Sequence, residues 1–133
     1  ARSFAEDSDT SVAALIQRIA EGTAAAHGAT VKFEYQHLYP VLVNAEDQSL
    51  IAENVVRDVL GDDGLEPAYP RTMASEDFSF MLNARPGCFV RIGAAFEGRA
   101  SAPLHNSKYE FNDDVLPIGA SFWARLVEME LPK

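Results

Sequence analysis

The sequence predicts an α/β fold class, with α+β character within the 133 residues given, and three patterns carry that prediction. Apolar side chains recur at helical spacing from Ser8 or Asp9 up to Gly28, which is typical of a helix with one covered face. Residues 31–36 alternate apolar and polar side chains, the period of a strand that is covered on one side. Residues 87–96 form an apolar run, which favours a buried strand of a parallel or mixed sheet.

The first part of the chain predicts an antiparallel sheet with a helix on one side. The opening ARSF has the character of the end of a strand, and because no initiator methionine precedes it we expect a truncated chain. In the strand at residues 31–36, Val31, Phe33 and Tyr35 share a face and are expected to pack against the helix as one cluster. The helix would contribute Val12, Leu15, Ile16, Ile19, Thr23 and Ala26.

A domain boundary is predicted between Tyr39 and Asn44, which gives domains of residues 1–43 and 44–133. Pro40 interrupts the strand pattern, since proline cannot donate to a sheet. Asn44 is placed to cap a second helix that runs to Gly61.

The second domain is expected to contain two further helices around the apolar strand. A short one covers residues 76–82, after a segment rich in glycine, proline and acidic residues. The last runs from about Asp114 to Leu131, with Pro117 in its first turn, where a missing N–H is tolerated. Its apolar stripe predicts packing against the core and consists of Ile118, Phe122, Leu126 and Met129.

Composition and charge narrow the class of protein. The formal charge of −9 would repel phosphate backbones, so we expect no nucleic-acid partner. No apolar run approaches the ~20 residues that cross a bilayer, and the start lacks the features of a signal peptide, so we expect a cytoplasmic protein with no membrane partner. The single cysteine, Cys88, excludes an internal disulfide and fits a buried strand position better than a nucleophile.

Three histidines and one acidic cluster are the candidates for chemistry. His27 closes a helix, where an imidazole interacts well with the carbonyl end, and His37 follows a strand with a surface or interface role expected. His105 lies in the polar turn PLHNSKYEFNDD and is either a metal ligand or an ordinary loop histidine. A catalytic metal centre needs at least three protein ligands, and His105 has no second cluster to complete one.

Ser75, Glu76 and Asp77 gather at the start of the short helix at residues 76–82. Such a group either caps the helix and satisfies its dipole or contributes to a site. Signatures such as G-x-S-x-G, C-x-x-C and H-E-x-x-H are absent, so the residues alone do not decide between these alternatives.

The ordered motifs MASEDFSFMLNARPGCFVRIG, LHNSKYEFNDD and LPIGASFWARLV resemble the C-terminal end of the M20 metallopeptidase family, in its amidohydrolase branch. That branch includes hippurate hydrolase, N-acyl-amino-acid amidohydrolases and auxin-conjugate hydrolases. The resemblance extends upstream through GATVKFEYQHLYPVLVN and covers nearly the whole chain. It implies that residues 1–43 are the second half of a ferredoxin-like lid that mediates dimerisation, and that residues 44–133 end a zinc-peptidase-like catalytic domain.

The same resemblance implies that His105 is the last ligand of a site for two divalent metals, zinc or manganese. Ser107 and Tyr109 replace the proline and phenylalanine common in the family, and neither change removes a donor. Ser75, Glu76 and Asp77 match a segment near the active site, beside the ligands or on the substrate wall.

The implied reaction is hydrolysis of the amide bond of an N-acyl amino acid by a metal-activated water. The family's H-x-C-G-H-D motif, its glutamate pair with the general base and its lid histidine are missing, so no catalytic residue is assigned here and the chain is expected to be inactive alone. We also expect homo-oligomers formed through the lid. The alternative is a non-catalytic helix-on-sheet interaction module, whose edge strand ATVKFEYQ pairs with another chain.

Overall fold

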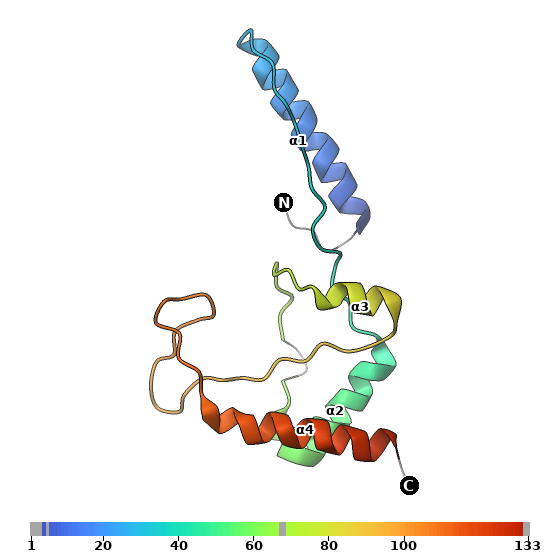
Figure 1. Ribbon diagram of the computed structural model, residues 1–133, viewed down its shortest axis with the longest axis vertical. Helices are drawn as coiled ribbons and strands as arrows, with labels where there is room; N and C mark the ends of the chain where they lie inside the picture. Colours follow the sequence, from blue (N-terminus) through green and yellow to red (C-terminus); the bar gives the residue numbers. More distant parts are fainter. Residues whose placement is uncertain (1–3, 5, 67–68, 132–133) are drawn as a thin grey trace. The chain divides into compact units, whose positions relative to one another are not determined.

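The computed structural model describes residue 4, residues 6–66 and residues 69–131, and helices are its regular elements (Figure 1). None of the helices in this described part is long and apolar enough to cross a membrane. The elements are α1 (Glu6–Ala26), α2 (Glu46–Leu60), η1 (Asp62–Gly64), α3 (Phe78–Ala84), η2 (Asp113–Val115) and α4 (Leu116–Glu130).

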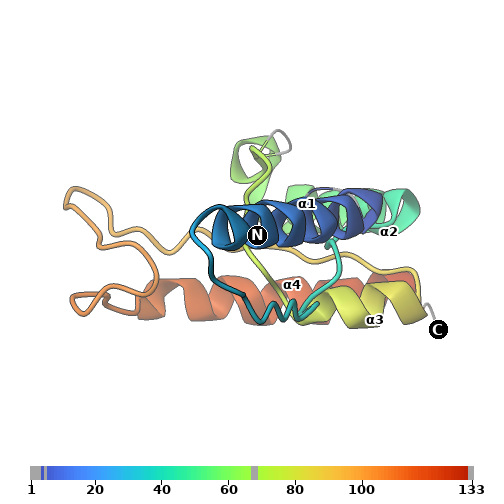
Figure 2. The ribbon, with the colours of Figure 1, turned by 90° about the horizontal axis from the view of Figure 1, so that it is seen from above.

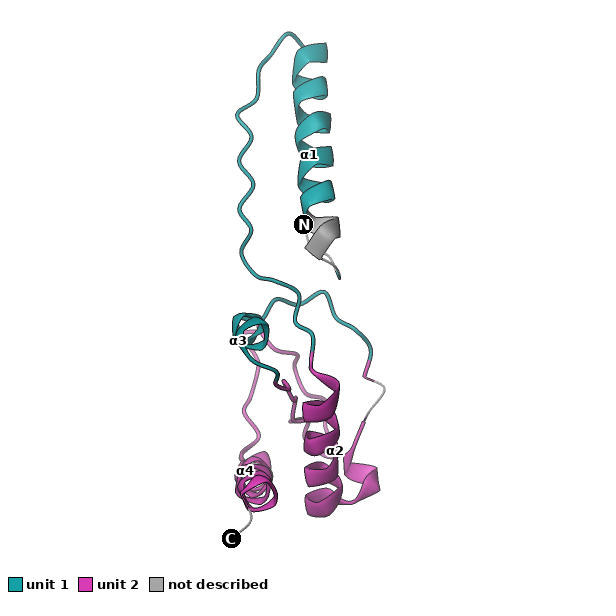
Figure 3. Ribbon diagram, turned by 90° about the vertical axis from the view of Figure 1, so that its right-hand side faces the viewer, with its two compact units in different colours: residues 1–43, 70–86 teal, residues 44–69, 87–133 magenta. Residues whose placement is uncertain are grey.

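The chain divides into two compact units (Figure 3). Unit 1 comprises residues 1–43 and 70–86, and unit 2 comprises residues 44–69 and 87–133. The two units are defined by the contacts within each of them, and their boundaries differ from those of the predicted domains. The assignment of residues 1–43 to a lid and of residues 44–133 to a catalytic domain stays a prediction.

The predicted α/β fold class is wrong for this structure, because the described residues contain helices and no strand. Both segments expected as strands, residues 31–36 and 87–96, lie outside any helix and lack a sheet ladder. A strand requires a neighbouring main chain to pair with its N–H and C=O groups, and apolar alternation alone does not supply one. The strand end predicted at ARSF lies mostly on residues outside the described ranges.

Helix α1 is terminated by Gly28, as predicted. The amide of Ala29 donates to the carbonyl of Ala24 at 2.9 Å and that of Gly28 donates to Ala25 at 3.0 Å. These two bonds form a Schellman motif, which needs a residue in the left-handed region. Gly28 has φ 68°, a conformation that costs glycine little.

After Gly28 the chain returns alongside α1 as an irregular extended segment (Figures 1 and 3). Here the predicted alternation of side chains is present: Phe33 and Tyr35 are half-buried, while Lys32 and Glu34 are exposed. The rings of Phe33 and Tyr35 stack with their centroids 6.3 Å apart, and His37 meets Tyr35 edge-on at 5.0 Å. Three alternate residues therefore form an aromatic row on one face of this segment.

The apolar stripe of α1 remains largely open to solvent. Leu15, Ile16 and Ile19 are between 38% and 58% exposed, and Val31 is 42% exposed. The buried cluster expected between α1 and Val31, Phe33 and Tyr35 is thus only partly covered.

Helix α3 contributes the one buried polar side chain found among the described residues, Ser79. Its hydroxyl donates to the carbonyl of Glu76 at 2.6 Å, which satisfies the group within the first turn. The ring of Phe80 lies 6.0 Å from that of Tyr39, so α3 packs against the end of the extended segment in unit 1.

Unit 2 is organised by contacts between α2 and α4. Val55 is fully buried and Ala52 nearly so, and both lie on α2. At the rim, Arg125 of α4 donates from Nε to Oδ2 of Asp58 at 2.6 Å, and from Nη1 to Glu128 at 3.1 Å. The pair with Asp58 links α4 to α2 at a solvent-exposed edge, whereas the bond to Glu128 stays within α4.

Asn44 does not cap α2, contrary to the sequence prediction. The N-cap residue is Ala45, without a side-chain bond. The side-chain amide of Asn44 instead pairs with both main-chain groups of Phe89. Its Oδ1 accepts from the Phe89 N–H at 2.8 Å, and its Nδ2 donates to the Phe89 C=O at 3.0 Å. The Asn44 side chain therefore takes the place of a neighbouring strand's peptide group.

This pairing holds the extended segment 87–93 against the helices of unit 2. The amide of Ala45 also donates to the carbonyl of Gly87 at 2.9 Å. Farther along, Ile92 lies so close to Gly119 of α4 that a Cβ added there would meet its Cδ1 at 3.4 Å. Cys88, expected at a buried strand position, lies outside any strand and is half-buried beside Asn44, with its Sγ 3.3 Å from the Asn44 Nδ2.

We predict that Asn44→Ala removes the protection of the Phe89 amide against hydrogen exchange, because its acceptor is lost. Asn44→Asp keeps an oxygen acceptor and should retain most of that protection. Asn54→Ala, a change at an exposed position of α2 whose side chain makes no bond with any described residue, is the matched control. Unchanged exchange at Phe89 in Asn44→Ala would contradict this role. The expected cost in unfolding free energy is about 1 kcal/mol.

Candidate functional site

His105 lies in a long irregular loop, residues 94–112, which connects the segment beside α2 and α4 to η2 (Figures 1 and 2). Its side chain is exposed, and its backbone has φ 64°, the one left-handed non-glycine residue within the described ranges. An L-residue adopts this conformation at a cost and keeps it only when its surroundings impose it.

The turn after His105 is closed by Asn106. Its Oδ1 accepts from the amide of Lys108 at 2.9 Å, and its carbonyl accepts from the amide of Tyr109 at 2.9 Å. These two bonds define a turn over residues 106–109, which begins directly after His105. The ring of Tyr109 in turn contacts that of Phe111 edge-on, with centroids 5.0 Å apart.

The two ends of the loop are joined by Asn112. Its Nδ2 donates to the carbonyl of Ala95 at 3.3 Å, and its Oδ1 accepts from the amide of Asp114 at 3.0 Å as the cap of η2. Within the first arm, the amide of Phe96 donates to the hydroxyl of Ser101 at 3.0 Å.

A second cross-link lies closer to His105. Arg99 Nη1 is 2.9 Å from Glu110 Oε2, and the Arg99 guanidinium lies 3.6 Å from the centre of the Phe96 ring. The hydrogen bond from Arg99 holds the pKa of Glu110 below its ordinary value, and the same bond raises the pKa of Arg99. Glu110 is therefore ionised throughout the neutral range. Sequence reasoning missed this pair, although opposite charges on either side of the PLHN turn were a visible signal.

As a metal ligand, His105 has the right donor but too few companions. Neutral imidazole is a common ligand for zinc and manganese, and the ring is accessible. No group of three or more His, Cys, Asp or Glu side chains that could hold an ion occurs in the described part of the chain. His105 alone does not form a metal site, because a catalytic centre takes at least three protein ligands.

The acidic cluster Ser75, Glu76 and Asp77 belongs to unit 1, whereas His105 belongs to unit 2, so neither unit contains both. Ser75 and Asp77 are exposed and Glu76 is half-buried. Asp77, rather than Ser75, occupies the N-cap position of α3 and makes no side-chain capping bond, and the expectation that the acidic residues satisfy the helix dipole stays a prediction. The carbonyl of Glu76 has the structural role, as acceptor for Ser79.

The other two histidines are also in unit 1. His27 follows the last turn of α1 and its amide donates to the carbonyl of Ala24 at 3.1 Å. His37 belongs to the aromatic row described above. Both are exposed and neither lies in the same unit as His105.

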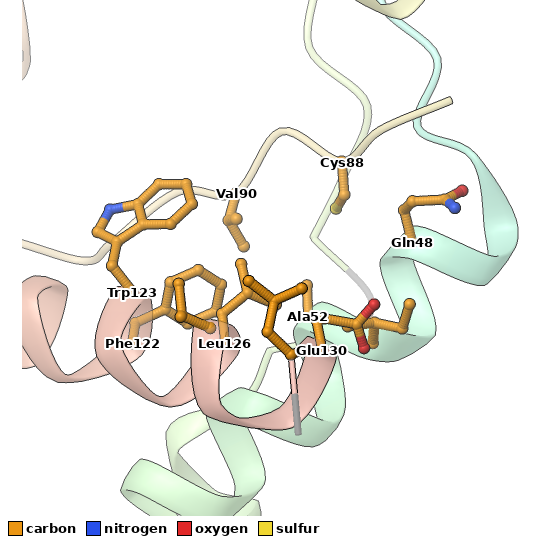
Figure 4. Close-up of a pocket in the computed structure, with 11 residues that line it drawn as sticks. Gln48, Ala52, Cys88, Val90, Phe122, Trp123, Leu126 and Glu130 are labelled. Carbon is orange, nitrogen blue, oxygen red and sulfur yellow. The ribbon is translucent and has the colours of Figure 1, made fainter. Parts of the chain in front are cut away.

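Unit 2 contains an open apolar cavity of about 340 Å³ between α2, α4 and the extended segment (Figure 4). Phe122, Trp123 and Leu126 of α4 form one wall, Val90 and Cys88 lie over it, and the remaining lining residues are Gln48, Ile51, Ala52, Val127, Glu130 and Leu131. Two residues of the stripe predicted to pack into a core, Phe122 and Leu126, therefore line a partly open space, whereas Ile118 and Met129 are not among the lining residues. His105 was expected to face a cavity, and it is not among these lining residues.

Comparison with known proteins identifies the wider family. Residues 2–129 match the sequence profile of the family described as "Peptidase family M20/M25/M40". IAA-amino acid hydrolase ILR1-like 2 of Arabidopsis thaliana is 39% identical over 65% of this chain, and hippurate hydrolase of Campylobacter jejuni is 32% identical over 84%. Thermostable carboxypeptidase 2 of Saccharolobus solfataricus is 26% identical over 90%.

These matches cover 20%, 28% and 30% of the respective relatives, so the chain spans less than a third of the length of each. Within the chain, by contrast, the family match reaches almost from end to end, through both units and through the loop that carries His105. The chain belongs to peptidase family M20/M25/M40.

Proposed function

We propose that this chain is the C-terminal part of a metal-dependent amidohydrolase that cleaves the amide bond of N-acyl amino acids. The main support for this proposal is the family match over residues 2–129, together with 32% identity to a hippurate hydrolase over 84% of the chain. Hippurate and IAA-amino acid conjugates, which the relatives' names specify, are both acids joined to an amino acid through an amide.

In this proposal the chain contributes one metal ligand, His105, and the other ligands and the general base come from the remainder of the parent polypeptide. The relatives are more than three times the length covered by this chain, which leaves room for the absent motifs. When bound, two zinc or manganese ions would supply a water of lowered pKa. The neutral imidazole of His105 would donate the lone pair of one ring nitrogen to a metal. Its other ring nitrogen would need a hydrogen-bond acceptor to fix the orientation of the ring.

Ser75, Glu76 and Asp77 are proposed to lie beside the substrate in the parent. The support is that the match includes this segment and that Ser75 and Asp77 have exposed side chains, free of any capping bond to α3. We propose that these three residues bind and orient the substrate, and we assign no proton transfer to them.

A second proposed role concerns association through unit 1, as a homo-oligomer. Leu15, Ile16, Ile19 and Val31 of unit 1 are exposed. An exposed apolar face favours association with another chain. This is also the feature that would support the alternative of a non-catalytic interaction module.

We predict that the purified 133-residue chain, supplied with zinc or manganese and hippurate, releases no detectable glycine. One imidazole leaves most of the coordination sphere of a metal unfilled and provides no positioned base. The assay is amino-acid release followed over hours, with a complete family member as positive control. Steady turnover by the chain alone would mean that it contains a full site.

In the parent polypeptide, His105→Ala should lower turnover by at least about 100-fold, because a direct ligand matters no less than the groups that orient ligands. His27→Ala removes an imidazole from the end of α1 and should leave turnover unchanged. Metal content and hydrolysis rate are measured on the same preparations. Equal activity of His105→Ala and the unmodified protein would contradict the ligand assignment.

A further inference from the structure

We propose that Arg99 is a positioning residue for His105: its ion pair with Glu110 and its contact with the Phe96 ring close the loop that carries His105 and restrict the backbone conformations open to that residue. The part of this inference that concerns metal rests on the proposed function, in which His105 is a ligand. The part that concerns the order of the loop stands on the structure of unit 2 alone.

The contacts form two successive closures of one loop. The outer closure is the bond from Asn112 to the carbonyl of Ala95, at 3.3 Å. The inner closure is the 2.9 Å pair between Arg99 and Glu110, and His105 lies near the middle of the sequence that it encloses. The inner closure thus shortens the free loop that carries His105.

Arg99 is held from two directions, which distinguishes it from an ordinary surface arginine. Its Nη1 is bonded to Glu110, while its Cζ lies 3.6 Å from the Phe96 ring centre. The planar guanidinium can satisfy a carboxylate with its edge and an aromatic ring with its face at once. Phe96 is itself fixed by the bond from its amide to Ser101.

A closed loop matters to His105 because its backbone is in the left-handed region, with φ 64°. If the arms were free, the chain would sample the more stable right-handed and extended conformations as well. A metal would then have to select the competent conformation, and the observed affinity would fall by the fraction in which it is populated.

The size of the effect is limited by exposure. The Arg99 and Glu110 side chains are 51% and 60% exposed, so water and salt screen their attraction. We therefore expect removal of the pair to lower zinc affinity in the parent by about fivefold, the upper range for an exposed pair. Loss of the ligand itself should have a far larger effect.

The first experiment measures the order of the loop in the 133-residue chain without metal. Backbone ¹⁵N relaxation is recorded for residues 102–108 in Arg99→Gln, in Glu110→Gln and in the exchanged pair Arg99→Glu with Glu110→Arg. Order parameters should fall from about 0.85 to below about 0.6 in each single variant and recover at least half of the loss in the exchanged pair.

Glu97→Gln is the matched control. Glu97 lies in the same arm of the loop as Arg99, carries the same charge as Glu110 and pairs with no described residue. This variant should leave both the order of the loop and the melting temperature unchanged. Unaltered order parameters in both Arg99→Gln and Glu110→Gln would overturn the proposal, as would equal disorder in Glu97→Gln.

The second experiment measures zinc affinity of the parent polypeptide by competition with a chelator. A fivefold loss in Arg99→Gln, restored in part by the exchanged pair, supports positioning. Unchanged affinity in Arg99→Gln, alongside a large loss in His105→Ala, would overturn it while leaving the proposed function intact. Unchanged affinity in His105→Ala would instead contradict the proposed function, and the relaxation data alone would then decide whether Arg99 orders the loop.

Discussion

The pairing of the Asn44 side chain with both main-chain groups of Phe89 is the interaction on which the architecture of unit 2 depends. It fixes the extended segment 87–93 beside the start of α2, and Ile92 of that segment then reaches Gly119 of α4. The loop with His105 begins where this segment ends. The position of the proposed ligand is therefore set by a chain of contacts that starts at one amide side chain.

The second constraint is how little apolar surface the described residues cover. Their buried apolar side chains are Ala52 and Val55, while Val90, Trp123 and Val127 line the cavity of unit 2 and are exposed. Burial of apolar area is the main favourable term in folding, so such faces are expected to acquire partners. This agrees with the proposal that the chain works as part of a longer polypeptide.

Sequence patterns located the helices closely but misjudged what lies between them. Helix α1 was expected from Ser8 or Asp9 and begins at Glu6, and both α1 and α2 end before the predicted glycines. The alternation at Phe33 and Tyr35 is present in their burial. It did not become a strand because a ladder depends on a partner distant in sequence, which no local pattern reveals. For the same reason the pairing of Asn44 with Phe89 was mistaken for a helix cap, and the contacts that close the loop around His105 were missed.

The central claim, that His105 is a metal ligand in the parent polypeptide, is tested most directly by replacing the native metal with ¹¹³Cd and recording ¹⁵N spectra of the histidine rings. The account predicts a scalar coupling between ¹¹³Cd and one ring nitrogen of His105, with none at His27 or His37, which belong to unit 1. A fully metal-loaded protein with no coupling at His105 would contradict it.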